Sequence, residues 1–299
     1  MPKRALLIYN PTARKAPTLE RLQAAASGVA GWEIGIELTA AGGHATELAR
    51  DARANGHDVV FACGGDGTIN EVANGLAGGT TALAVVRGGT ANVWAKEIGA
   101  PKDPAKALRL LTEGEMRTVD LGKAGERYFL LMAGVGYDAA TVRELASGLK
   151  QRLGAAAYII AGFHQARRYR ASSVDLRVDG EQLPLELYWL MLGNTRNYGG
   201  LLNLAHMARV DDGKLELLVL SRGGIFRFAW LALWALFKRH QQLRDVTHRS
   251  ITSLGINAPG LPVQVDGEFL GETPMDFAIA PGALRVIVPR GRRTPLFSR

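Results

Sequence analysis

Residues 1–122 alternate short, strongly apolar runs with longer segments whose apolar residues recur at helical spacing. The clearest apolar runs are Ala5–Tyr9, Asp58–Cys63 and Ala82–Val86. Parallel strands need long crossover connections, which are usually helices. The observed alternation is typical of parallel strands joined by helices. We therefore predict an α/β domain with a parallel sheet. A further strand is expected at Trp32–Leu38, and helices at Thr18–Ser27, His44–Ala54, Thr68–Ala77, Ala91–Ile98 and Pro104–Thr112.

After residue 122 the pattern changes to closely spaced strands separated by Asp-Gly and Pro-Gly pairs, which favour tight turns. We predict a second domain, residues 123–289, that is a β-sandwich with helical insertions at 153–168 and 225–242. The tail, 290–299, is free to return to the first domain. The expected strands are Tyr128–Ala133, Ser173–Val178, Leu187–Leu192, Lys214–Leu220, Thr247–Ile256, Val263–Val265, Met275–Ile279 and Leu284–Val288.

Composition excludes several classes of protein. With 299 residues, 47% of them hydrophobic, the chain can bury a core in each of two domains. A single cysteine, Cys63, excludes an intramolecular disulfide and a cysteine-rich zinc site. Because no apolar run is as long as a membrane span, we expect a cytoplasmic protein. Lys and Arg number 36 against 28 Asp and Glu, which favours an anionic partner such as a nucleotide or a lipid surface.

Glycine-rich loops follow two of the predicted parallel strands. Gly64–Thr68, with the sequence Gly-Gly-Asp-Gly-Thr, leads into a helix, and Arg87–Asn92 does the same after the next strand. Glycines let a backbone approach a ligand closely, and helix N-termini attract phosphate. These loops and Asn10-Pro11-Thr12 follow strand ends, where open α/β sheets bind ligands. Asp66 is expected in an exposed loop. A tight strand-to-helix turn is the alternative for each, and the chain has neither a Walker A nor a GxGxxG motif.

The order of these motifs resembles the diacylglycerol kinase catalytic family, which includes bacterial lipid kinases and sphingosine and ceramide kinases. The resemblance rests on Asn10-Pro11, on Gly64–Thr68 continued by Ile69–Val72, on Gly89–Asn92 and on Val265–Glu268. It covers nearly the whole chain. The Gly-Gly-Asp-Gly-Thr loop alone is shared with NAD kinases and resembles a phosphofructokinase loop. The implied fold is an NAD kinase/phosphofructokinase-like α/β domain followed by a β-sandwich.

The resemblance also implies an activity and a set of site residues. The activity is transfer of the γ-phosphoryl group of ATP, with Mg²⁺, to a hydroxyl of diacylglycerol, a sphingoid base or a ceramide-like lipid. Asp266 would be the general base, with Glu268 beside it. The implied nucleotide site comprises Asn10, Thr39, Gly64, Gly65, Asp66, Gly67, Thr68, Glu71, Gly89, Thr90 and Asn92. The implied metal residues are Asp66 and Asp120 in one Mg²⁺ network, and Arg209, Asp212 and Lys214 at a second, structural ion.

Two positions depart from the family pattern. The first strand is followed by Thr12-Ala13-Arg14, where the family often has x-Ser-Gly. Val93 follows Asn92, where relatives often carry Asp. Because Val offers no oxygen ligand, we expect Mg²⁺ to arrive mainly with ATP.

Two apolar segments end in basic clusters: Ile225–Phe237, before Lys238-Arg239-His240, and Leu153–Phe163, before Arg167–Arg170. Each is interpreted either as a buried helix or as a helix in a membrane interface. We expect peripheral binding to the anionic inner face of a membrane and no nucleic-acid partner, and the oligomeric state, a homodimer included, stays open.

Two other functions remain as alternatives to a lipid kinase. One is a soluble-nucleotide kinase of the NAD kinase type, and the other is a non-catalytic protein that binds lipid or nucleotide. Asn70-Glu71 directly after the glycine loop, and the Val265–Glu268 turn, favour the lipid kinase.

Overall fold

The computed structural model describes residues 3–146, 162, 164–166, 168–200, 202–291 and 294–298. The chain forms two compact units. The N-terminal unit comprises Met1–Leu121, Val210–Asp212 and Ala280–Arg299, and the C-terminal unit comprises Gly122–Arg209 and Gly213–Ile279.

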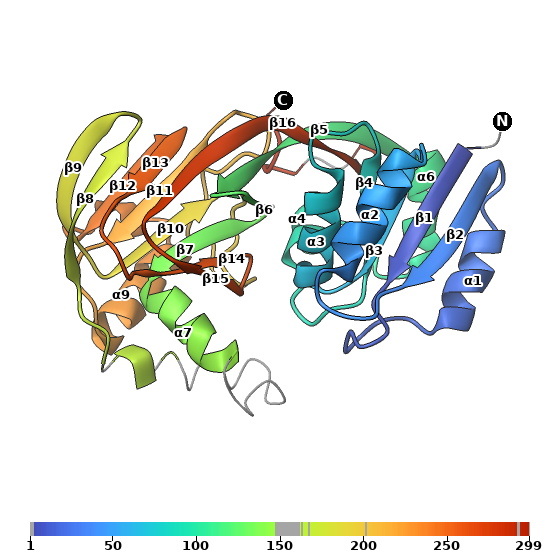
Figure 1. The fold of residues 1–299 in the computed structure, drawn as a ribbon. Coiled ribbons are helices and arrows are strands. Elements are labelled where there is room, and N and C mark those ends of the chain that lie inside the picture. The colour runs from blue at the N-terminus through green and yellow to red at the C-terminus, as the bar shows by residue number, and fades with distance from the viewer. Residues whose placement is uncertain are drawn as a thin grey trace. The chain divides into compact units, whose positions relative to one another are not determined.

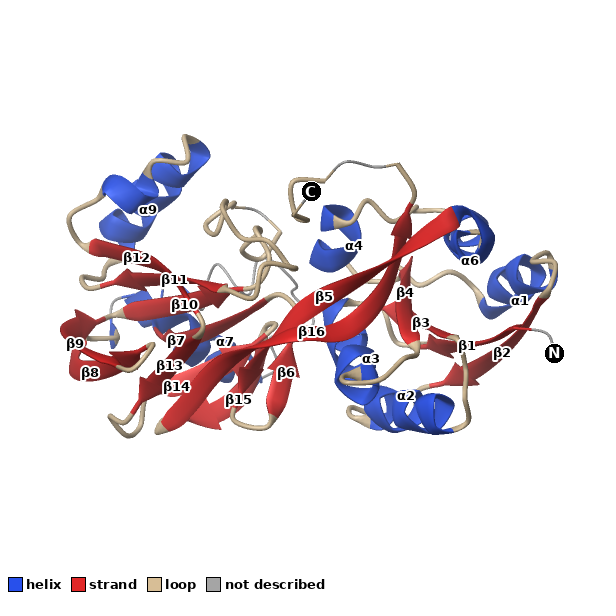
Figure 2. Cartoon of the chain, turned by 90° about the horizontal axis from the view of Figure 1, so that it is seen from above, coloured by secondary structure: helices blue, strands red, loops and turns tan. Residues whose placement is uncertain are grey.

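The N-terminal unit is built on parallel strands in the order β2-β1-β3-β4. Every residue of β3 is buried, as are five of the seven in β1, which fits parallel strands covered on both faces. Helices α1 and α6 cover one face of this sheet, and α2 and α3 cover the other (Figures 1 and 2). The elements are β1 (Lys3–Tyr9), α1 (Leu19–Ser27), β2 (Trp32–Leu38), α2 (His44–Ala54), β3 (Val59–Gly64), α3 (Asp66–Leu76), β4 (Ala82–Arg87), α4 (Val93–Glu97), α5 (Pro104–Leu108) and α6 (Leu110–Glu113).

The C-terminal unit is a β-sandwich. One layer is the sheet β12-β11-β10-β7-β14-β15, and the other contains β9, β8, β13 and the start of β16. Buried Leu, Val and Ile side chains from both layers form one core cluster. Two strands, β5 (Gly114–Ala124) and β16 (Met275–Pro289), have residues in both units. The other elements are β6 (Arg127–Phe129), β7 (Met132–Gly136), α7 (Tyr137–Ala146), β8 (Ser172–Val178), β9 (Glu181–Leu187), β10 (Trp189–Gly193), β11 (Leu215–Leu220), α9 (Ile225–Leu236), η2 (His240–Gln242), β12 (Val246–Ile251), β13 (Ser253–Ile256), β14 (Pro262–Val265) and β15 (Glu268–Glu272).

Four sequence predictions of element boundaries are wrong. The first, Tyr128–Ala133, is divided between β6 and β7. Met275–Ile279 and Leu284–Val288 belong to one strand, β16: Gly282 (φ +61°) donates its N–H to Asp120 Oδ1 (2.7 Å) and the chain does not reverse. Thr247–Ile256 is two strands, because Thr252 donates its N–H and hydroxyl to Asp179 Oδ1 where the chain passes from one sheet to the other. The helix predicted over Pro104–Thr112 divides at Arg109 into α5 and α6.

The two predicted helical insertions have different outcomes. Most of 153–168 lies outside the described residues, although Gly162, His164–Ala166 and Arg168 are helical. The insertion at 225–242 forms α9 and the short η2. Among the residues that the structure describes, no helix is long and apolar enough to cross a membrane.

Candidate active site

Three loops meet at the carboxyl ends of β1, β3 and β4, as the sequence predicts. The N–H of Asn10 donates to the carbonyl of Cys63 (2.9 Å), and the N–H of Gly88 donates to the carbonyl of Gly64 (2.9 Å). Lys15, beyond the first strand, donates its N–H to the carbonyl of Gly88 (2.9 Å). The three loops are therefore joined by backbone hydrogen bonds.

Two asparagine side chains reinforce this junction. Asn10 donates from Nδ2 to Thr68 Oγ1 (3.0 Å). Asn92 is buried, donates from Nδ2 to the carbonyl of Gly64 (3.1 Å) and accepts from the N–H of Gly89 at Oδ1 (2.9 Å). Thr90 is exposed in the second glycine loop. Asn10 and Asn92 thus hold the loops in place, whatever else they contact.

The glycines of these loops have two different roles. A Cβ atom on Gly89 would lie 2.5 Å from Gly65 Cα, and one on Gly64 would lie 2.5 Å from Thr68 Oγ1, so both positions exclude a side chain. A Cβ on Gly65 would meet its nearest heavy atom, Gly89 Cα, at 3.7 Å, which is ordinary contact. Packing therefore does not require glycine at Gly65, unlike Gly64 and Gly89.

A cavity of about 140 Å³ opens beside these loops. Its volume is below the ~300–1,000 Å³ typical of small-molecule sites, so it is too small to enclose a whole nucleotide. Glu71 Oε2 accepts from the N–H of Ala45 (3.2 Å), in the first turn of α2. The lining consists of Asn10, Thr12, Thr39, Ala40, Ala41, Gly42, Ala45, Thr68 and Glu71, and four of these are predicted nucleotide residues.

Asp66 is the first residue of α3, and its side chain faces α4. Burial raises the pKa of the Asp66 carboxyl, while backbone N–H groups of Val93, Trp94 and Asn92 lower it. Its Oδ1 is buried and accepts no hydrogen bond among the described residues. Val93 itself is only 4% exposed. Asp66 is therefore half-buried and interacts with the start of α4, while its Oδ1 has no hydrogen-bond partner among the described residues. The prediction that Asp66 lies in an exposed loop is wrong.

The remaining predicted metal residues make other contacts. Asp120 is buried on β5, where Oδ1 accepts from Gly282, and its own N–H donates to the carbonyl of Val210 (2.6 Å). Arg209, Asp212 and Lys214 lie on the loop that leads into β11. Within the described part of the chain, no group of three or more His, Cys, Asp or Glu could by itself hold a metal ion.

Asp266 lies in the tight turn between β14 and β15. Its φ of +48°, followed by +88° at Gly267, is typical of a type I′ turn. The carboxylate accepts three backbone N–H groups: Leu130 at Oδ2 (2.8 Å), and Leu131 and Met132 at Oδ1 (2.9 Å each). The predicted neighbour, Glu268, forms an ion pair with Arg127 (3.3 Å) and is half exposed.

A second turn in the same unit has the same construction. Asp179 (φ +48°) and Gly180 (φ +90°) join β8 to β9, and Asp179 Oδ1 accepts the N–H groups of Thr252 (2.9 Å) and Ser253 (2.8 Å). Turn geometry alone therefore does not mark Asp266 as a catalytic residue.

One buried carboxylate near this turn was missed by the sequence prediction. Asp138, at the start of α7, accepts from Gln264 Nε2 (3.1 Å) and the Tyr198 hydroxyl (3.4 Å), both at Oδ2. Gln264 Oε1 in turn accepts the N–H of Gly267 (2.8 Å), which connects Asp138 to the Asp266 turn. The available signal was an Asp two residues after the strand-ending Gly136, as at Gly64 and Asp66.

The buried Asp138 predicts a pH-dependent stability. Burial raises its pKa to about 7, although hydrogen bonds from Trp189 and Gln264 oppose the rise. The folded protein then holds this proton more tightly than the unfolded chain, so the free energy of unfolding falls as pH rises from about 4 to about 7. Asp138→Asn cannot ionise. We expect urea unfolding between pH 5 and pH 8 to show a fall smaller by about 1–3 kcal/mol in this variant than in the wild type.

Asp175→Asn, at an exposed position on β8, is the matched control and should keep the wild-type pH profile. Parallel profiles for Asp138→Asn and the wild type would contradict the assignment of the raised pKa to Asp138.

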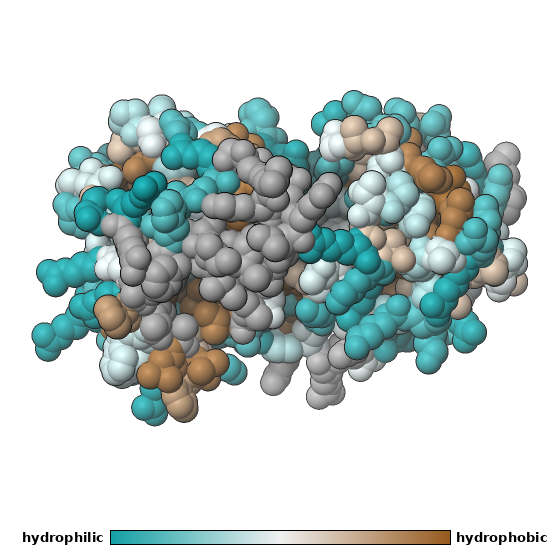
Figure 3. Space-filling view, turned by 90° about the horizontal axis from the view of Figure 1, so that it is seen from below, coloured by the Kyte–Doolittle hydropathy of each residue, from teal (hydrophilic) through white to brown (hydrophobic). Residues whose placement is uncertain are grey.

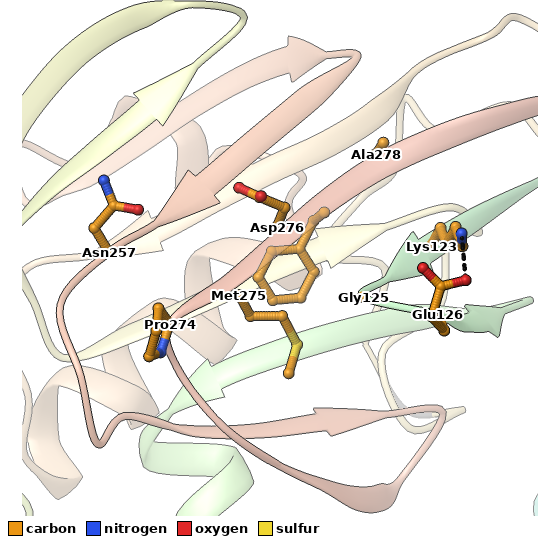
Figure 4. Close-up of a pocket in the computed structure, with 9 residues that line it drawn as sticks. Lys123, Gly125, Glu126, Asn257, Pro274, Met275, Asp276 and Ala278 are labelled. Atoms are coloured by element: carbon orange, nitrogen blue, oxygen red, sulfur yellow. Dashed lines mark hydrogen bonds and ion pairs between the residues drawn. The ribbon is translucent and has the colours of Figure 1, made fainter.

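A larger cavity, of about 480 Å³, lies on the C-terminal unit (Figure 4). Its charged groups are paired, Lys123 with Glu126 (3.0 Å) and Asp276 with Arg177 (3.0 Å). No predicted site residue that the structure describes is among its lining residues, so its volume does not make it the active site. The lining is Lys123, Gly125, Glu126, Asn257, Pro274, Met275, Asp276, Phe277 and Ala278.

Comparison with known proteins identifies the family. The family model of the diacylglycerol kinase catalytic domain matches residues 4–124, and that of the YegS C-terminal NAD kinase beta sandwich-like domain matches residues 132–288. A diacylglycerol kinase of Bacillus subtilis (strain 168) is 30% identical, over 98% of this chain and 99% of the relative. The chain belongs to the diacylglycerol kinase family. It is therefore an enzyme, a lipid kinase, and its family implies the use of ATP.

Other relatives agree. A diacylglycerol kinase of Staphylococcus aureus (strain bovine RF122 / ET3-1) is 32% identical to the kinase, over 93% of this chain and 90% of the relative. A crystal structure of a diacylglycerol kinase from Bacillus anthracis (strain Sterne) superposes with a TM-score of 0.70 at 25% identity, covering 96% of this chain and 97% of that one. The predicted fold class, an α/β domain with a parallel sheet followed by a β-sandwich, is confirmed.

Proposed function

We propose that the kinase transfers the γ-phosphoryl group of ATP to the free primary hydroxyl of a diacylglycerol. The observation that supports this acceptor most is that similarity to proteins named diacylglycerol kinase extends over 98% of the chain, through the β-sandwich as well as the α/β unit. Similarity limited to the nucleotide-binding unit would support a kinase activity but would not indicate which acceptor is phosphorylated.

The nucleotide is proposed to bind at the three joined loops. The triphosphate would lie against Gly64–Thr68, where Gly65 leaves room for it and the N-terminus of α3 supplies free N–H groups. Asn10, Thr39 and Glu71 would line the adjoining part of the nucleotide site, because they line the small cavity there. Gly89, Thr90 and Asn92 would complete it from the second loop.

Mg²⁺ fits one feature of this site. The buried, unbonded Oδ1 of Asp66 is the kind of oxygen that Mg²⁺ accepts as a ligand, and Val93 adds none. The ion would then take its other ligands from water and the phosphates, and when bound it neutralises charge on the transferring group. We keep Asp120 as a candidate for the wider network. Arg209 and Lys214, through their carbonyls, and Asp212 are candidates for a separate structural ion.

Asp266 is the proposed general base. Three backbone N–H groups fix the direction of its carboxylate, and phosphoryl transfer depends on such positioning. The carboxylate accepts the proton of the lipid hydroxyl as the hydroxyl oxygen bonds to the γ-phosphorus and the bond to ADP breaks. Glu268, paired with Arg127, stands beside this turn as a candidate for orienting the acceptor.

The acceptor is a membrane lipid, so the kinase is proposed to act at a membrane surface. Its formal net charge of +8 favours an anionic one.

The proposal is tested with labelled ATP and a panel of acceptors: dioleoylglycerol, ceramide, sphingosine and NAD⁺. We expect kcat/KM for dioleoylglycerol to exceed that for each other acceptor by about tenfold or more. NAD⁺ as the best acceptor would replace the lipid kinase with an NAD kinase-type enzyme. ATP binding without phosphorylation of any acceptor would support the non-catalytic alternative.

A further inference from the structure

We propose that the exposed face of α9, together with the arginine-lined cavity beside it, docks the kinase on an anionic lipid bilayer. The inference rests on the proposed function in one respect, that the acceptor is a lipid held in a membrane.

α9 carries an apolar stripe that faces solvent. Phe226 is 88% exposed, Trp230 46%, Leu233 46% and Phe237, just beyond the helix, 70%. Their spacing of four, three and four residues places them on one side of a helix with about 3.6 residues per turn. In Figure 3, hydrophobic residues gather at the lower left, where α9 lies when the view of Figure 2 is turned over. We call these four residues the apolar stripe.

The opposite side of α9 is already packed. Leu231 and Ala235 are 2% and 3% exposed. Just after the helix, buried His240 makes a hydrogen bond through Nε2 to the carbonyl of Leu204 (2.7 Å). The helix is therefore fixed to its own unit by one side, and the apolar stripe remains available to a partner.

Positive charge flanks the apolar stripe. The segment 221–246 contains five Lys or Arg residues and a single acidic residue, Asp245. Asp245 pairs with Arg227 (3.4 Å). Lys238 and Arg239 follow the helix at its other end, and both are exposed. Such a surface complements anionic headgroups, whereas a second copy of the same surface would be repelled by it.

A cavity of about 500 Å³ adjoins the N-terminal end of α9. Its lining consists of Ser221, Arg222, Arg227, Leu243, Arg244 and Asp245. Arg227 is paired there with Asp245. The guanidinium groups of Arg222 and Arg244, with the Ser221 hydroxyl, are suited to a phosphate group, which Arg binds through paired N–H donors. The cavity and the apolar stripe meet at Phe226-Arg227, so one phospholipid could present its phosphate to the arginines and its acyl chains to the stripe.

A bilayer surface explains both features together. Aromatic side chains on one face, cations at both ends and a length of about 18 Å are typical of a helix that lies in the membrane interface without crossing it. An exposed apolar patch on its own would fit a protein partner as well. The Lys and Arg side chains around the apolar stripe favour an anionic lipid surface over a protein partner.

The test is co-sedimentation of the purified full-length kinase with vesicles of phosphatidylcholine, and with vesicles that also contain phosphatidylglycerol. The wild type should bind the anionic vesicles more tightly, and added salt should weaken that binding. Phe226→Gln/Trp230→Gln and Arg222→Gln/Arg244→Gln should each weaken it by about tenfold or more. Met116→Gln and Arg50→Gln/Arg109→Gln, matched exposed residues on other elements, should bind like the wild type.

A second readout separates docking from chemistry. With a short-chain diacylglycerol in neutral detergent micelles, both α9 variants should keep the wild-type turnover. If the wild type phosphorylates no lipid in micelles while its vesicle binding still depends on α9, the proposed function fails and the docking surface stands.

Two outcomes would overturn the docking proposal. One is unchanged binding of either α9 variant to anionic vesicles. The other is a wild-type dimer in sedimentation velocity that Phe226→Gln/Trp230→Gln converts to monomer, because the apolar stripe would then be an interface between copies of the chain.

Discussion

Asp266→Asn should lower kcat for lipid phosphorylation by about 10²–10⁴-fold, the usual contribution of a general base. Asn has nearly the shape of Asp but cannot accept the proton of the acceptor hydroxyl at neutral pH. KM for ATP should change by less than about threefold, because the residue is not expected to contact the nucleotide. Steady-state rates at saturating lipid, with ATP varied, give both quantities.

The same substitution also disturbs a turn, and Asp179→Asn controls for that effect. In Asp266→Asn an amide NH₂ replaces one acceptor of the three backbone N–H groups, which should cost about 1–3 kcal/mol of unfolding free energy. Asp179 occupies a turn with the same φ angles and accepts backbone N–H groups in the same way. Asp179→Asn should therefore lose comparable stability and keep kcat. Equal kcat values for the two variants would contradict the role of Asp266 as general base and leave it only a structural role in the turn.

Gly89→Ala and Gly65→Ala should separate loop packing from phosphate binding. In Gly89→Ala the new methyl group would lie 2.5 Å from Gly65 Cα, so the two loops must move apart. We expect a loss of about 1–3 kcal/mol in unfolding free energy and impaired ATP binding. In Gly65→Ala the nearest atom is at 3.7 Å, so stability should stay within about 0.5 kcal/mol of the wild type.

For Gly65→Ala we nevertheless expect KM for ATP to rise by about tenfold, because the methyl group occupies the space assigned to the triphosphate. Thermal unfolding and ATP titration of both variants measure these effects. A wild-type KM for ATP in Gly65→Ala would contradict the proposal that the triphosphate binds at this loop. Wild-type stability in Gly89→Ala would contradict the close packing of the two loops.

Local sequence patterns predicted the parts of the fold that depend on neighbouring residues. The fully buried parallel strands have continuous apolar runs such as Val59–Cys63, and Asp179-Gly180 and Asp266-Gly267 form the turns that their residue types favour. The three loops at the strand ends followed from sheet topology, because parallel strands place their carboxyl ends at one edge. Their functional roles came from the family resemblance.

Contacts between distant residues decided what the sequence did not show. The Gly282 N–H is held by Asp120, 162 positions away, so a Pro-Gly pair typical of a turn lies inside a strand. The connection of Asp138 to the Asp266 turn passes through Gln264, 126 positions further along the chain. The apolar sequence of α9 fits a buried helix and an interfacial helix alike, and only the fold shows that one side of it faces solvent.

The central claim is tested most directly by following the γ-phosphoryl group itself. The purified kinase is incubated with Mg²⁺, dioleoylglycerol in detergent micelles and ATP labelled on the γ-phosphorus, and the lipids are separated by thin-layer chromatography. The account predicts label in phosphatidate, in an amount equal to the ADP formed, and none when the label is on the α-phosphorus. ADP formation without labelled phosphatidate would contradict it.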